Sequence, residues 1–140
     1  MKTTLLILAT LVALTGCTKQ KGCTDAQSLN YNSDAEVNDG SCAYLSGTYL
    51  MTEQCDVQDK FNVTIPENGV TFTIQNFAHI FPVVTAYRIR TAIVIDSQTV
   101  KDTDNNSWTV SGYGSISADG KTLTLNYTLD GYSCSASGNK

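Results

Sequence analysis

The sequence predicts an all-β domain, an antiparallel meander of about eight short strands that forms a small barrel or sandwich. From Tyr44 onward, apolar and polar residues alternate with the period of two that is typical of half-buried strands. Turn signals rich in Gly, Asn and Asp interrupt this alternation about every 8 to 12 residues. The same region carries no helical periodicity of useful length.

The first part of the domain supplies strands that each have one apolar face. Between residues 47 and 55, alternate positions carry Tyr49, Met51, Glu53 and Cys55. The expected elements are strands over residues 47–55, 60–65 and 70–74, a turn at 66–69, and a less regular stretch at 76–81 that Pro82 ends.

The middle of the domain is its most apolar part. Residues 83–95 are almost continuously apolar apart from Arg88, Arg90 and Thr91, which predicts two central strands with a tight break near Arg90. The remaining expected elements are a polar loop at 102–106, a strand at 108–117, a hairpin turn at 118–121, its partner strand at 122–129, a turn at 130–131, and a final short strand with Cys134.

The N-terminus has the form of a secretory signal peptide. Lys2 precedes an apolar core over residues 5–14, which is too short to span a membrane because a spanning helix needs about 20 apolar residues. The sequence Leu14-Thr15-Gly16-Cys17 that ends this stretch resembles the bacterial lipobox. The resemblance implies that residues 1–16 are removed as a lipoprotein signal peptide and that Cys17 is acylated. An ordinary signal peptide followed by a free thiol is the alternative.

The lipid on Cys17 is the expected membrane partner, since several acyl chains give stable anchoring where one does not. Lys2 leaves with the signal peptide, so residues 17–140 carry 8 basic and 13 acidic side chains and a formal net charge of −5. That charge argues against nucleic acid and anionic lipid as direct partners. We therefore expect a lipid-anchored protein of the cell envelope. Thr18 resembles an outer-membrane sorting signal, and the leaflet stays open.

The other cysteines form an even set once Cys17 is acylated. Cys23, Cys42, Cys55 and Cys134 allow three pairings in an exported, disulfide-permissive chain. We favour Cys23–Cys42 and Cys55–Cys134, because the first two lie in the N-terminal tail and the last two bracket the β domain. Zinc is disfavoured, since the sequence has no CxxC spacing and a single imidazole.

Residues 17–45 form the expected lipid-anchored tether. From Gly22 to Cys42 the sequence resembles a motif of secreted and surface proteins of some Gram-negative bacteria, GCTDxxAxNYNxxAxxDDGSC. The segment is too small to bury a core, so one disulfide must close it. Its polar residues suit Asx-turns, which we favour over a calcium site. The calcium candidates are Asp25, Asp34, Glu36, Asn38 and Asp39.

Residues 46–138 carry a second resemblance. The runs GTY, FNVTI, VTFTIQNF, IVIDSQTV, WTVSGYGSIS and KTLTLNYT, followed by a late Cys, are similar to lipocalin-like lipoprotein domains of the same bacteria. The resemblance implies a lipocalin-like β domain. Barrels of about eight strands can hold one small apolar ligand, although side chains fill many of them.

Catalytic signals are weak throughout the chain. His79 is the only imidazole, no serine lies in a GxSxG elbow, and Gly112-Tyr113-Gly114 lies within a strand without the rest of a dinucleotide fingerprint. Acid–base chemistry would need a pair of carboxylates. The available ones mostly lie at turns, where solvated carboxylates are expected: Glu53, Asp56, Asp59 and Glu67. We therefore expect neither an enzyme nor a bound cofactor.

A small-molecule site is the leading functional hypothesis. Alternation places Trp108, Gly112 and Gly114 on one face of their strand, opposite a row of the next strand that includes Leu125 and Tyr127. Two inward glycines remove side-chain volume beside that row. They would either open a cavity for a small apolar ligand or allow a sharp bend of the barrel, and bending is the commoner cause.

Surface interaction is the alternative function. Tyr113 and Tyr132 are the aromatic residues most plausibly exposed, so they could stack on a glycan. Arg88 and Arg90 share a face and could clamp a carboxylate, but the solvated side of a strand is the simpler interpretation. In this alternative the chain is a structural or adhesive surface module without a ligand cavity.

Overall fold

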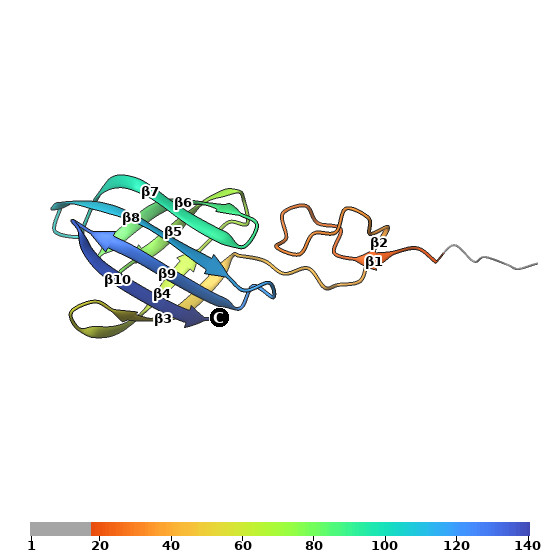
Figure 1. The fold of residues 1–140 in the computed structure, drawn as a ribbon, viewed down its shortest axis with the longest axis horizontal. Coiled ribbons are helices and arrows are strands. Elements are labelled where there is room, and N and C mark those ends of the chain that lie inside the picture. Colours follow the sequence, from red (N-terminus) through yellow and green to blue (C-terminus); the bar gives the residue numbers. More distant parts are fainter. Residues whose placement is uncertain (1–17) are drawn as a thin grey trace, which may run out of the picture.

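The computed structural model describes residues 18–140, in which eight antiparallel strands close into a barrel (Figure 1). Neighbours in the barrel follow the chain order, and β10 pairs with β3 to close it. The predicted all-β meander is thus confirmed, with closure as a barrel. Its strands are β3 (Gly47–Gln54), β4 (Gln58–Ile65), β5 (Thr71–Phe77), β6 (Phe81–Ile89), β7 (Ala92–Lys101), β8 (Ser107–Ile116), β9 (Thr122–Leu129) and β10 (Tyr132–Asn139).

The predicted signal peptide and the acylation of Cys17 lie outside the described residues. Residues 18–140 contain no helix that is long and apolar enough to cross a lipid bilayer.

Short turns connect the strands, and most of them lie where the sequence predicts a turn. β6 and β7 turn at Arg90, which has a positive φ of 59°, so the predicted break is confirmed. The stretch over residues 76–81 is instead a hairpin, in which β5 runs to Phe77 and β6 starts at Phe81. Pro82 therefore lies inside β6, near its start, where a missing N–H is tolerated.

The barrel interior is filled by the apolar face of every strand. Tyr49, Phe72, Phe77 and Phe81 are among its largest fully buried side chains. Each buried side chain of this size contributes roughly 1.5–3 kcal/mol through removal from water. Alternation inside the strands therefore accounts for which residues form the core.

Both predicted disulfides are present, Cys23–Cys42 in the tail and Cys55–Cys134 in the barrel. The second one lies at the seam where the sheet closes. β10 and β3 share five paired positions, which end at Ser135 and Gln54, and the disulfide joins Cys134 of β10 to Cys55, the residue that follows β3. Cys55–Cys134 thus fastens the two strands just beyond the end of their pairing.

The tail docks on one end of the barrel, which we call the proximal end (Figure 1). Among residues 18–45, the only regular strand pairing is parallel, between β1 (Lys21–Gly22) and β2 (Val37–Asn38). Lys140 donates from Nζ to the carbonyl oxygens of Tyr44 and Ser46, at 2.7 Å each. The opposite, distal end carries the Cys55–Cys134 bond and the turn with His79.

Arg88 fixes the tail to the proximal end. Its guanidinium donates to the backbone carbonyl of Gln27 in the tail at 3.0 Å, and to those of Asn68 and Gly69 in the β4–β5 connection at 3.2 Å. It also donates to the carbonyl of Arg90. Arg90 is exposed, so the two arginines do not form a carboxylate clamp.

Candidate functional site

The predicted ligand residues Trp108, Leu125 and Tyr127 lie on the inner face of the barrel, where other core side chains contact them. The ring centroid of Tyr127 lies 4.7 Å from that of Phe77, and Trp108 meets Phe81 edge-on at 6.1 Å. Leu125 is 1% exposed. These residues do come together, and they do so as part of the packed core.

Gly112 and Gly114 face inward as predicted, but the volume beside them is taken by β9. A Cβ at Gly112 would lie 2.6 Å from the carbonyl oxygen of Asn126, and one at Gly114 would clash with that of Thr124. The glycines thus permit a close approach of two strands. This geometry favours the bending interpretation over a cavity at these positions.

Trp108 is further held by the loop between β7 and β8. Its Nε1 donates to Asp102 at 2.8 Å, and the same carboxylate accepts the backbone N–H groups of Asp104 and Asn106. The Trp108 hydrogen bond, followed by those of Asn106 and Asp104, lowers the pKa of Asp102 against the opposing effect of burial. Trp108 therefore anchors this loop at the distal end.

The candidate acid–base residues do not form one cluster, because His79 and Asp59 meet at the distal end whereas Glu67 lies in the β4–β5 connection at the proximal end. His79 Nε2 lies 3.2 Å from a carboxylate oxygen of Asp59, and both side chains are half exposed. Asp56 and Glu67 are exposed. Within residues 18–140, no hydroxyl or thiol forms a hydrogen bond with His79, so the pair lacks an attached nucleophile.

Glu53 departs from the expectation of a solvated carboxylate. It is 7% exposed, and its Oε1 has no hydrogen-bond partner in the described chain, nor does the buried hydroxyl of Tyr127. Burial raises the pKa of Glu53, the charge of His79 opposes that rise, and Asp59 adds to it. Alternation with Tyr49 and Met51 had already placed Glu53 on the inner face.

Three of the five calcium candidates of the tail accept hydrogen bonds within its turns. Asp25, Asn38 and Asp39 accept the backbone N–H groups of Gln27, Gly40 and Ser41, respectively, at 2.9 Å. Asp34 and Glu36 are exposed. In the described part of the chain, no three His, Cys, Asp or Glu residues lie close enough to hold a metal ion. Asp25, Asn38 and Asp39 therefore form the hydrogen bonds of Asx-turns.

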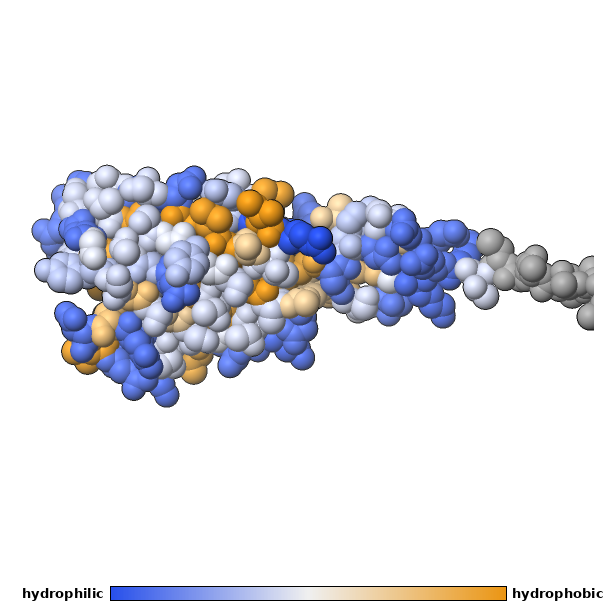
Figure 2. All heavy atoms as spheres, viewed as in Figure 1, coloured by the Kyte–Doolittle hydropathy of each residue, from blue (hydrophilic) through white to orange (hydrophobic). Residues whose placement is uncertain are grey.

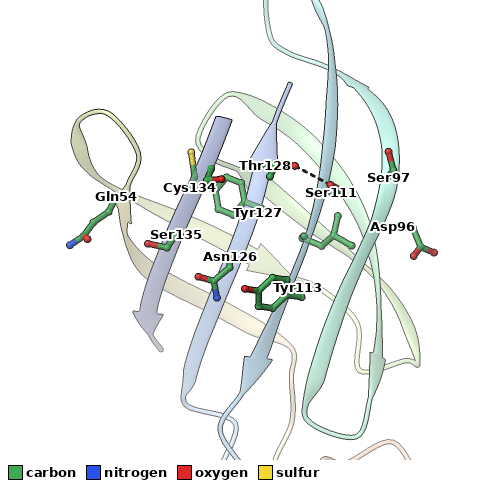
Figure 3. A pocket seen from close by; sticks show the side chains of 13 residues that line it. Gln54, Asp96, Ser97, Ser111, Tyr113, Asn126, Tyr127, Thr128, Cys134 and Ser135 are labelled. Atoms are coloured by element: carbon green, nitrogen blue, oxygen red, sulfur yellow. Dashed lines mark hydrogen bonds between the residues drawn. The ribbon is translucent and has the colours of Figure 1, made fainter. Parts of the chain in front are cut away.

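An open groove of about 640 Å³ crosses the outer face of β7, β8, β9 and β10 (Figure 3). Two rows of outward side chains line it, and each row follows the pairing of neighbouring strands. What we call the tyrosine row consists of Tyr113, Asn126, Ser135 and Gln54. What we call the hydroxyl row consists of Ser97, Ser111, Thr128 and Ser133.

A β-bulge completes one side of the groove. Pairing of β7 with β8 shifts between Ile95 and Gln98, so that Asp96 and Ser97 both lie opposite Ser111. The extra residue brings a second polar side chain to the groove. Bulges often re-aim side chains in this way near functional sites.

The groove is of mixed polarity and almost uncharged. Ile95, Gly112, Tyr127 and Cys134 also line it, so it includes two of the predicted ligand residues, and Asp96 is the only charged lining residue among residues 18–140. Ser111 and Thr128 share a hydrogen bond of 3.0 Å across β8 and β9. Among the described residues, the side chains of Tyr113, Asn126 and Ser135 form no hydrogen bond with the rest of the protein. They are therefore free to bind a ligand.

The surface aromatic residues lie where the sequence predicted. Tyr113 is 66% exposed and Tyr132 is 70% exposed, but only Tyr113 lines the groove. Figure 2 shows the face over β8 to β10 as mostly pale, the colour of intermediate hydropathy. Apolar residues gather instead toward the proximal end of β6 and β7, where Ile89 is exposed.

A smaller hollow of about 440 Å³ lies over β5, β6 and β7. Gln98 occupies a bridging position there. Its side-chain amide donates to the carbonyl of Thr85 at 2.7 Å and accepts the N–H of Thr85 at 3.1 Å. Direct pairing between β6 and β7 ends at the pair Tyr87–Val94, and beyond it the side chain of Gln98 supplies the hydrogen bonds to β6. The hollow therefore has a structural explanation.

Comparison with known proteins found no matching family model, no similar curated protein and no similar solved structure. The class defined by the fold is a closed, eight-stranded antiparallel barrel with a disulfide-closed tail.

Proposed function

We propose that this chain is a lipid-anchored, non-catalytic protein of the cell envelope that works as an adhesive surface module, through the outside of its barrel. The lipobox-like sequence ending at Cys17 supports the anchor. Two disulfides fit an exported protein, because such bonds persist in oxidising compartments.

We place the binding surface on the outside of the barrel because side chains already occupy the interior. At the positions expected to bind an apolar ligand, the interior is occupied by contacts such as Phe77 with Tyr127 and Phe81 with Trp108. The groove beside Tyr113, in contrast, is open to solvent and has free polar side chains. A ligand therefore meets no packed side chains on the outside of the barrel.

The docked tail gives the module a defined orientation. Cys17 lies six residues before Cys23, and the disulfide-closed segment that follows is bonded to the proximal end through Arg88 and Lys140. An acylated Cys17 would therefore direct the proximal end toward the membrane. The groove on the side wall and the distal end would then remain accessible from outside.

A fluorescence titration distinguishes this function from the binding of an apolar ligand inside the barrel. Trp108 is the only tryptophan and packs, partly buried, against the core, so an apolar molecule in the interior would change its emission. Residues 18–140 include both disulfides and every contact described above. We expect this form, titrated with N-phenyl-1-naphthylamine, to show no saturable change in Trp108 emission.

A cavity variant provides the positive control. Leu125→Ala removes a fully buried side chain and should leave an apolar void that admits small apolar molecules. Saturable, one-to-one binding of the probe by the wild-type protein would overturn the proposal and support an interior apolar ligand. The anchor is tested separately, since Cys17→Ser should move the protein out of the membrane fraction.

A further inference from the structure

We infer that the groove over β7 to β10 binds an uncharged carbohydrate. The inference rests on the proposed function, because it supplies the ligand class of the outer surface. Figure 3 shows side chains of the two rows from close by.

The tyrosine row presents an aromatic ring beside amides and hydroxyls. Tyr113 and Asn126 are direct partners across β8 and β9, and Asn126 is the partner of Ser135 on β10. Tyr113 is 66% exposed, so one face of its ring is available to the apolar C–H face of a sugar. The amide of Asn126 offers both a donor and an acceptor next to that ring.

The hydroxyl row runs parallel to the tyrosine row. Ser111, Thr128 and Ser133 each lie two residues away from a member of the tyrosine row on the same strand, which separates the rows by about 7 Å. Hydroxyls both donate and accept, so the row suits a ligand that is itself rich in hydroxyl groups. The volume of about 640 Å³ lies within the range of small-ligand sites.

Charge narrows the ligand to uncharged carbohydrates. Among the residues that the structure describes, Asp96 is the only charged one that lines the groove, and residues 17–140 carry a net charge of −5. A phosphate, sulfate or carboxylate group would therefore meet no arginine or lysine in the groove and would be repelled by Asp96. Neutral sugars carry no such penalty.

Closure of the barrel argues against an extended peptide as the ligand. Peptides that bind to sheets usually add a strand at a free edge. Each of β7, β8, β9 and β10 already pairs with a neighbour on both sides, so the groove offers no edge. Recognition must therefore come from side chains, as hydroxyl and amide contacts to a sugar would provide.

The test is isothermal titration calorimetry of the 18–140 form with four neutral oligosaccharides: cellotetraose, chitotetraose, mannotetraose and maltotetraose. Dextran sulfate serves as the anionic comparison. We expect at least one neutral oligosaccharide to bind, and we expect Tyr113→Ala and Asn126→Ala to weaken that binding by about tenfold or more. Tyr132→Ala is the matched control, because Tyr132 is equally exposed but does not line the groove.

Three results would overturn the inference: no binding by any of the four, binding that both groove variants leave unchanged, or equal binding of dextran sulfate. Failure here is distinguishable from failure of the proposed function. Without oligosaccharide binding, an absence of probe binding by the wild-type interior would still support an outer-surface module with another ligand.

Discussion

The tail and the barrel are each closed by one disulfide, yet different forces hold them. The barrel buries a continuous core that includes Tyr49 and Phe72. The tail, over residues 18–45, buries Cys23 and Leu45 but relies mainly on hydrogen bonds from Asn and Asp side chains to its own backbone. The disulfide of the barrel therefore reinforces a region that its core already holds together, whereas the tail requires its disulfide to stay folded.

The largest effect on unfolding free energy is expected for the barrel disulfide. Cys55→Ser with Cys134→Ala opens a loop with a sequence separation of 79 residues, which costs about 4.5 kcal/mol on the chain-entropy model. Urea unfolding followed by Trp108 fluorescence measures the loss. The barrel should still fold, because Cys134 is the only core residue that the variant changes. A loss below about 1 kcal/mol would show that strand pairing alone secures the seam.

Removal of the tail disulfide should have the next largest effect, and it should stay local. Cys23→Ser with Cys42→Ser releases a loop with a separation of 19 residues, worth about 3 kcal/mol. With so little core, the tail is expected to lose its structure while the barrel keeps its unfolding midpoint. Hydrogen exchange at the Leu29 amide, which donates to the Ala43 carbonyl, reports on the tail. Retained protection at Leu29 would mean that docking on the barrel suffices.

Much of this contrast could be predicted from the sequence. Alternation alone placed Tyr49, Met51 and Glu53 on one face, because side chains in a strand change sides at every residue. The location of the cysteines gave both disulfides. Composition separated the polar tail from the alternating domain, since turns and strands use different residues.

The groove could not be predicted in this way, because it depends on register. Ser97, Ser111, Thr128 and Ser133 come from four strands, and only their pairing brings them into one row. A shift of one residue in any pair would have turned its side chain to the other face. The docking of the tail could not be predicted either. Arg88 donates hydrogen bonds to backbone carbonyl groups, and because every residue has such a group, the sequence does not indicate which ones Arg88 contacts.

A substitution at Arg88 tests whether the two regions form one unit. Arg88→Lys keeps the charge but loses the fork that reaches several carbonyls, so we expect the docked tail to be weakened by roughly 1–2 kcal/mol. Limited proteolysis within residues 18–45 should accelerate, with the barrel resistant. Arg90→Lys, a change at an exposed residue of the same turn, is the control. Equal proteolysis of both variants would show that the hydrogen bonds of Arg88 do not hold the tail on the barrel.

The smallest expected effect concerns Glu53 and depends on pH. Burial raises its pKa in the folded protein, so the unfolded chain releases this proton more readily than the folded chain does. Stability is therefore unaffected below the unfolded pKa and falls as the pH rises from there through the folded pKa. Glu53→Gln removes this ionisation, and we expect a gain of roughly 1 kcal/mol at neutral pH that disappears near pH 4.

Thermal unfolding of the two proteins between about pH 4 and pH 7 measures that gain. Asp56→Asn is the control, because Asp56 is an exposed carboxylate of the connection that follows β3. A Glu53→Gln variant less stable than the wild type at neutral pH would mean that the charged carboxylate has a stabilising partner in solution. In that case the Oε1 of Glu53, which has no partner in the described chain, would be bound by a water in solution, since each buried polar group needs a partner.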